Sequence, residues 1–184
     1  MSPCGVSQKF VMPKVVRAMR ELQPQVIITF GADGLYGHDD HIAIGELTTK
    51  ACAAAAQLDA FPQHFEEGLA LHHTTKFYYA ACPKGLMTAL VERLQLAGLP
   101  SNLWDISASE FGIPGEAITT EIDVRDFVDR KLAALRCHQT QMMDDHAFKS
   151  IPLEIGTEFL SVEHFYLVSE ISPSRLEVDL FADT

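Results

Sequence analysis

The sequence predicts an α/β fold in which a mostly parallel sheet is flanked by helices, and three observations predict it. Residues Val26–Phe30 form a continuous apolar, β-branched run, which is typical of a buried strand in a parallel sheet. Apolar residues recur at helical spacing on both sides of this run. Further strand-like runs occur at residues 77–80, 117–122 and 162–168. Helices and strands therefore alternate along the chain, as they do in α/β proteins.

The first part of the chain is expected to run from a helix through a strand and a loop to a second helix. Pro13 suits the first turn of a helix that ends at Pro24. The loop Gly31–Gly34 follows the strand at its carboxyl end. Asp39 or Asp40 is expected to cap the second helix. The apolar stripe of that helix comprises Ile44, Leu47, Ala51, Ala54 and Leu58.

The later part of the chain contains two further helical segments between the remaining strands. Residues 86–96 are expected to form a helix bounded by Gly85 and Gly98. Asp123 is expected to cap a helix that carries Phe127, Lys131, Ala134, Leu135 and His138. No internal repeat or low-complexity tract interrupts the pattern, so residues 1–184 are predicted to form one domain.

Composition excludes some classes of function. Apolar residues make up 47% and charged residues 21% of the chain, as in ordinary globular proteins. The net charge of −11 argues against binding to nucleic acid or to an anionic membrane, because both need a basic surface. The four cysteines are widely spaced, so reduced thiols are expected rather than a disulfide framework. No apolar stretch long enough to cross a membrane and no signal peptide is evident, which predicts a cytoplasmic protein.

The segment Gly37–His41, just after the first predicted strand, is the most informative motif. His38 and His41 are three residues apart and lie on one face if the segment is helical. With the carboxylate of Asp40 they offer nitrogen and oxygen ligands that suit a divalent metal such as zinc. The segment alone supplies too few ligands to hold one. Its place at the carboxyl end of a strand is where α/β sheets bind ligands.

Several motifs, in this order along the chain, resemble the LmbE-like, or PIG-L-like, family of zinc-dependent N-deacetylases. Residues 26–41 are similar to the family's segment that ends in His-Pro-Asp-His, and Lys76–Tyr79 is similar to its Lys-Leu-Tyr-Tyr strand. Residues 118–141 are similar to its C-terminal signature, and Glu163–Phe165 resembles its closing strand. The resemblance implies a Rossmann-like sheet and covers roughly residues 14–168.

The resemblance also implies roles for four residues. His41 would be a ligand of zinc or another divalent metal, leaving one position for water. His38 would lie beside the developing oxyanion, stabilising it or protonating the leaving amine. Asp40 would orient His38, and Tyr36 would reach the substrate carbonyl. The implied reaction is hydrolysis of an N-acetyl group on an N-acetylglucosamine-type substrate, an amino sugar.

Two departures from the family pattern qualify this expectation. The family's first motif, Ala-His-Pro-Asp-Asp-Glu, supplies two metal ligands and the general base, and it is absent. Only 37 residues precede His38, so the chain resembles a C-terminal portion of the family fold, with the N-terminal part missing. Asp39 stands where the family usually has proline. Missing strands also predict an exposed sheet edge and hence homo-oligomer formation.

Less specific interpretations remain beside the enzymatic one. The chain is alternatively a non-catalytic remnant that serves as a saccharide-binding or subunit-interface domain. His72-His73 is expected at the surface, and Asp144-Asp145-His146 is expected in a solvated loop. His138 and Gln141 belong to the family signature, where a structural hydrogen bond and a substrate contact are equally compatible with the sequence.

Overall fold

The computed structural model describes residues 8–168, 176–182 and Thr184, which fall into two compact units. The N-terminal unit contains the chain up to Ala80, together with Tyr166–Val168 and the residues from Leu180 onward. The C-terminal unit contains Ala81–Phe165 and the described residues up to Asp179. The single domain over residues 1–184 stays a prediction.

The strands form a mixed sheet, which confirms the α/β class. The strands are β1 (Val26–Phe30), β2 (Lys76–Ala81), β3 (Thr120–Asp123) and β4 (Val162–Leu167). β1 pairs with β2 in parallel, with Ile28 opposite Tyr78. β3 pairs with β4 in antiparallel fashion, with Glu121 opposite His164. The strand order is β1-β2-β4-β3, which leaves β1 at one end of the described sheet.

Eight α-helices are described. They are α1 (Gln8–Leu22), α2 (Gly34–Gly37), α3 (Asp39–Ala55), α4 (Gln63–Glu66), α5 (Leu86–Leu96), α6 (Val128–Arg136), α7 (Ala147–Ser150) and α8 (Leu153–Leu160). Short 3-10 turns span residues 108–110, 115–117, 125–127 and 139–141.

Some predicted helix boundaries are wrong. α1 starts at Gln8, so Pro13 lies inside the helix and not in its first turn. Asp123 does not cap α6, because its carboxylate accepts a hydrogen bond from the Arg125 backbone in the 3-10 turn before that helix. The predicted bounds of α5 are confirmed.

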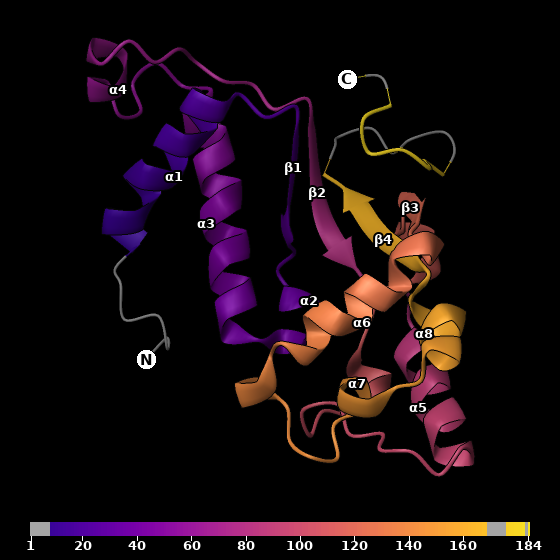
Figure 1. The fold of residues 1–184 in the computed structure, drawn as a ribbon. Coiled ribbons are helices and arrows are strands. Elements are labelled where there is room, and N and C mark those ends of the chain that lie inside the picture. Colours follow the sequence, from indigo (N-terminus) through magenta and orange to yellow (C-terminus); the bar gives the residue numbers. More distant parts are fainter. Residues whose placement is uncertain (1–7, 169–175, 183) are drawn as a thin grey trace. The chain divides into compact units, whose positions relative to one another are not determined.

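In the N-terminal unit, α3 packs against α1 and β1 (Figure 1). Val16 and Met19 of α1 meet Ala51 and Ala55 of α3 in a buried apolar cluster. Arg20 is also buried, and its guanidinium donates hydrogen bonds to backbone carbonyls at the C-terminal end of α3. The last carbonyl groups of a helix lack the i+4 partner that interior ones have, and Arg20 adds side-chain hydrogen bonds to them that fix α1 to the end of α3.

The predicted apolar stripe of α3 is only partly buried. Leu47 and Ala51 are in the core, but Ile44 is 42% exposed. Leu58 is 70% exposed because α3 ends at Ala55, before that position is reached. The helix thus ends before the last residue of the predicted stripe.

In the C-terminal unit, α5, α6 and α8 share a core. Buried apolar side chains from these helices include Leu90, Leu94, Val128, Leu132, Ile155 and Leu160. Gly156 lets α8 approach α6 closely, since a Cβ at this position would lie 2.7 Å from a methyl carbon of Leu132. α8 was not predicted from the sequence.

No disulfide joins the described cysteines, which are Cys52, Cys82 and Cys137, and Cys4 lies outside the described residues. Within the described part of the chain, none of the helices combines the length and the apolar character that crossing a bilayer requires.

Gly45 sets how closely α3 lies to β1. A Cβ at this position would lie 2.3 Å from the backbone oxygen of Phe30, which belongs to the strand and does not move easily. Gly45→Ala is expected to lower the free energy of unfolding by about 1–3 kcal/mol, as other overpacking substitutions do. Urea unfolding measures this. Gly115→Ala is the matched control, because a Cβ at Gly115 meets nothing within 4 Å, and an equal loss in both variants would contradict the explanation.

Candidate functional site

The candidate site lies where β1 leads into α3, within the N-terminal unit. The chain turns sharply here, with Gly34 at φ +57° and Gly37 at φ +81°. Leu35 also has a positive φ of 70°, so α2 is a strained turn rather than a regular helix. At Gly34 a Cβ would lie 2.8 Å from the Ile42 side chain, so the turn packs directly against the start of α3. This packing brings the turn next to His41.

His41 is held on two sides. Its imidazole stacks on the ring of Phe30, with centroids 3.9 Å apart and planes 4° from parallel. Its Nδ1 lies 3.1 Å from the backbone oxygen of Gly34. A carbonyl oxygen only accepts, so Nδ1 carries the hydrogen and Nε2 presents a lone pair. Burial lowers the pKa of His41, and the neutral form with this tautomer is favoured at neutral pH.

His38 has the opposite arrangement of hydrogens. It is the N-cap residue of α3, and its Nδ1 accepts a hydrogen bond from the Asp40 backbone N–H at 3.2 Å. Nδ1 is therefore unprotonated, and the neutral ring carries its hydrogen on Nε2. The centroids of the His38 and His41 rings are 4.9 Å apart. The site thus pairs one histidine that can donate a hydrogen bond with one that can donate an electron pair.

Tyr36 completes the group. Its ring meets His41 edge-on at 5.1 Å and His38 at 5.9 Å between centroids. Burial raises the pKa of Tyr36, so its phenol keeps the proton and can donate it in a hydrogen bond. The structure therefore brings Tyr36, His38 and His41 together, as the sequence spacing suggests.

The two aspartates lie in the first turn of α3, where negative charge stabilises a helix. Neither is the N-cap residue, so the expectation that Asp39 or Asp40 caps this helix is wrong; His38 does so. Asp39 is exposed. Asp40 fixes His38 through its backbone amide, while its carboxylate oxygen Oδ1 is buried with no hydrogen-bond partner in the described part of the chain. A buried carboxylate oxygen in this state is costly unless a further group meets it.

The fit of the site to zinc is incomplete. The Nε2 lone pair of His41 and the unpaired Oδ1 of Asp40 are both suitable for a cation. Within residues 8–168 and the described C-terminal residues, no group of three or more histidine, cysteine or acidic side chains is placed to hold a metal ion. The described residues therefore do not supply a complete set of zinc ligands.

Two predictions about other histidines are wrong. His72 is 5% exposed, not at the surface, and one ring nitrogen lies 3.0 Å from the Pro24 carbonyl oxygen, while His73 is exposed as expected. His146 is 2% exposed, although Asp144 and Asp145 beside it are in solvent. The burial of His72 and His146 could not be predicted from the polar residues beside them. The groups that cover these rings, such as Pro24 and Trp104, lie far away in the sequence.

This fold and site define an α/β protein with a pair of histidines and a buried carboxylate at the carboxyl end of a parallel strand. The relatives of the chain are more specific. A "1D-myo-inositol 2-acetamido-2-deoxy-alpha-D-glucopyranoside deacetylase 1" from Catenulispora acidiphila is 32% identical over 174 residues, covering 91% of this chain and 53% of the relative. A deacetylase of the same name, without the final numeral, from Thermobispora bispora is 33% identical over 186 residues, covering 92% and 60%. No protein-family model matches the chain.

Two solved structures share the fold. An N,N'-diacetylchitobiose deacetylase from Pyrococcus horikoshii superposes with a TM-score of 0.55 and 16% identity, covering 91% of this chain and 54% of the other. A 4-carboxy-2-hydroxymuconate hydratase from Pseudomonas putida gives a TM-score of 0.56 and 14% identity, covering 96% and 65%. The fold therefore occurs with different chemistries, and function depends on the site.

The relatives confirm the resemblance drawn from the sequence motifs: the chain belongs to the LmbE/PIG-L-like family. It spans little more than half the length of these curated relatives.

Proposed function

We propose that this chain carries part of the active site of an N-deacetylase, which hydrolyses the N-acetyl amide of an N-acetylglucosamine-type substrate. The observation that carries the proposal is the opposite hydrogen arrangement of His38 and His41, 4.9 Å apart. Amide hydrolysis needs a hydrogen-bond donor at the developing oxyanion and a means of activating the carbonyl or the water. The names of the relatives support the substrate class.

The proposed roles follow from the hydrogen positions. His38 directs Nε2–H toward the substrate, where it stabilises negative charge on the carbonyl oxygen. The Asp40 backbone amide keeps the His38 ring in this tautomer. Tyr36 donates a hydrogen bond from its phenol to the substrate carbonyl.

We further propose that the enzyme uses zinc or another divalent metal, with His41 Nε2 as one ligand. The remaining ligands and the general base come from residues outside those described, since no complete ligand group lies among residues 8–168 and 176–184 that the structure places. When bound, such a metal acidifies water and polarises an amide carbonyl. The unpaired Oδ1 of Asp40 lies in the same turn of α3 and is available to a group that completes the site.

Acetate release tests the proposal. The chain is incubated with an N-acetylglucosamine-containing substrate, with and without zinc, and free amine and acetate are quantified. Hydrolysis that depends on metal and on His41 supports the proposal. Hydrolysis by the chain alone that survives both a chelator and His41→Ala would exclude the proposed metal mechanism.

The second candidate is a non-catalytic saccharide-binding or subunit-interface domain. The position of β1 at the end of the strand order favours it, because its Ile28 is 46% exposed although it is a strand residue. Unpaired strand edges promote association between chains. Light scattering separates the outcomes: a monomer that releases acetate supports the enzyme, and an oligomer that binds amino sugar without hydrolysis supports this alternative.

A further inference from the structure

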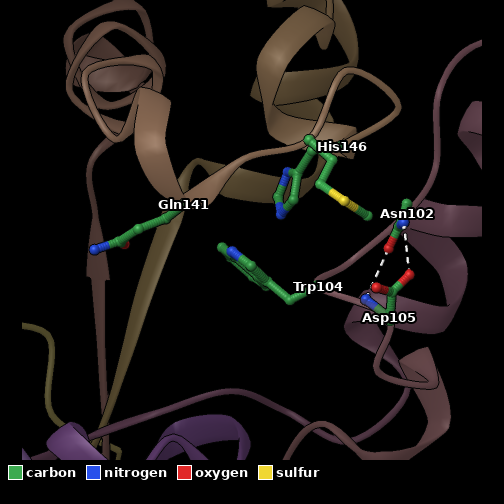
Figure 2. A pocket seen from close by; sticks show the side chains of 6 residues that line it. Asn102, Trp104, Asp105, Gln141 and His146 are labelled. Carbon is green, nitrogen blue, oxygen red and sulfur yellow. Dashed lines mark hydrogen bonds between the residues drawn. The ribbon is translucent and has the colours of Figure 1, made fainter. Parts of the chain in front are cut away.

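The C-terminal unit contains a pocket that is separate in sequence from the histidine site of β1 and α3. The pocket has a volume of about 190 Å3 and is partly open to solvent. Its walls come from two segments, the loop after α5 and the loop before α7 (Figure 2). The lining residues are Asn102, Trp104, Asp105, Gln141, Met143 and His146.

His146 is the most unusual of these side chains. It is 2% exposed, and its Nδ1 accepts a hydrogen bond from the Phe148 backbone N–H at 3.2 Å. The neutral ring therefore carries its hydrogen on Nε2. This Nε2 is buried and has no hydrogen-bond partner within the described residues. Burial also lowers the pKa of His146, so the ring is a neutral donor and not a cation. A buried donor without an acceptor is unfavourable and rare.

Trp104 forms the apolar wall beside this donor. Its indole meets the His146 ring edge to face, with centroids 4.3 Å apart (Figure 2). Trp104 and its neighbour Asp105 both have positive φ, 52° and 57°, which is strained for residues with side chains. Because the two rings are in contact, an oxygen atom that accepts a hydrogen bond from His146 Nε2–H would also lie close to the indole of Trp104.

Asn102 stabilises the strained loop. Its side chain donates to the carboxylates of Asp105 at 3.0 Å and Asp145 at 3.1 Å, and it accepts from the Asp105 backbone N–H at 2.9 Å. The pocket lining thus includes the carboxylate of Asp105, and a carboxylate repels an anion and accepts hydrogen bonds from hydroxyl or ammonium groups. Gln141, on the other side of Trp104 in Figure 2, adds an amide that can both donate and accept.

We propose that this pocket binds a single sugar ring, neutral or amine-bearing, with one ring substituent oxygen accepting a hydrogen bond from His146 Nε2–H. The volume is below the range of drug-sized pockets and suits a ligand of about one ring. A sugar offers C–H groups to the indole face, an acceptor to His146 and donors to Asp105. This binding is independent of hydrolysis and of the histidine pair at α3.

Trp104 makes the proposal directly measurable, because it is the only tryptophan in the chain. We expect saturable changes in its fluorescence on titration with N-acetylglucosamine and glucosamine. Glucuronate serves as a sugar of the same ring size that carries an anionic group, and it should bind more weakly than either. Tighter binding of glucuronate, or no saturable change with the other two sugars, would overturn the proposal.

His146→Asn tests the role of the donor. An asparagine Oδ1 can still accept from the Phe148 backbone N–H, so the local turn is retained while the Nε2–H is removed. Affinity for the sugars should fall by roughly tenfold or more, as expected for loss of one hydrogen bond in a pocket. His164→Asn, the same change in β4 away from the lining residues, is the matched control.

The two variants are compared by thermal unfolding and by titration. Reduced affinity in His146→Asn, with unfolding temperatures that match and with normal affinity in His164→Asn, supports the proposal. Equal affinity in His146→Asn and the unmodified chain would contradict it. An equal loss in both variants would also contradict it, because the effect would then not depend on the buried donor.

Discussion

His41→Asn is expected to remove the metal and to reduce hydrolysis to the background rate. An asparagine amide can still donate to the Gly34 carbonyl, which takes the hydrogen bond from Nδ1 in the wild type, but it has no group in place of the Nε2 lone pair. Removing a residue that only orients a ligand weakens metal affinity by up to about 100-fold. Loss of a direct ligand such as His41 should weaken it by more than that. Metal content per chain and zinc titration of active protein measure this effect.

The pH dependence of metal binding adds a second readout for His41. Burial lowers its pKa from the ordinary value near 6.5, so the proton competes with the metal only at more acidic pH. Metal affinity should stay constant as the pH falls toward 6.5 and decrease below it. His73→Asn, at an exposed histidine, is the control and should leave the profile unchanged. Equal zinc content in His41→Asn and the unmodified protein would contradict the assignment.

His38→Asn is expected to reduce the hydrolysis rate by about 10²–10⁴-fold while leaving the metal content unchanged. The asparagine side chain can still accept from the Asp40 backbone N–H, so the N-cap of α3 is retained. What is lost is the Nε2–H that faces the substrate in the proposed mechanism. The kcat and the zinc content of active protein are measured together.

The two substitutions separate the proposed roles. If His38→Asn lost metal as well as activity, His38 would be a ligand and not a hydrogen-bond donor to the oxyanion. If it retained full activity, the oxyanion would be stabilised by another group. Similar unfolding midpoints in both variants would show that the changes do not arise from a damaged fold.

Elements with strong local signals could be predicted from the sequence. α5 lies between Gly85 and Gly98, which adopt φ values of +90° and +67°, and glycine at both ends gave its bounds. The β-branched run of β1 was equally clear. α8 was missed because Gly156 lies in its middle, and only the packing against Leu132 explains that glycine.

The site shows the same division between local and distant determinants. The closeness of His38 and His41 follows from a three-residue spacing at the start of a helix, so the sequence was sufficient. The identity of the N-cap was not predicted, because a histidine ring replaces the aspartate carboxylate that usually has this role. The burial of His146 depends on Trp104, from a loop far away in the sequence, and no spacing rule reports such a contact.

The stacking of His41 on Phe30 has an entropic consequence. An imidazole that is free to rotate loses rotamer freedom when it is fixed by a ligand, and this loss weakens binding. Here the ring is already immobilised by the aromatic face of a strand residue and by the Gly34 carbonyl, so folding has set its orientation beforehand. In the proposed site Phe30 therefore strengthens binding by holding the His41 ring so that its Nε2 lone pair points in one direction.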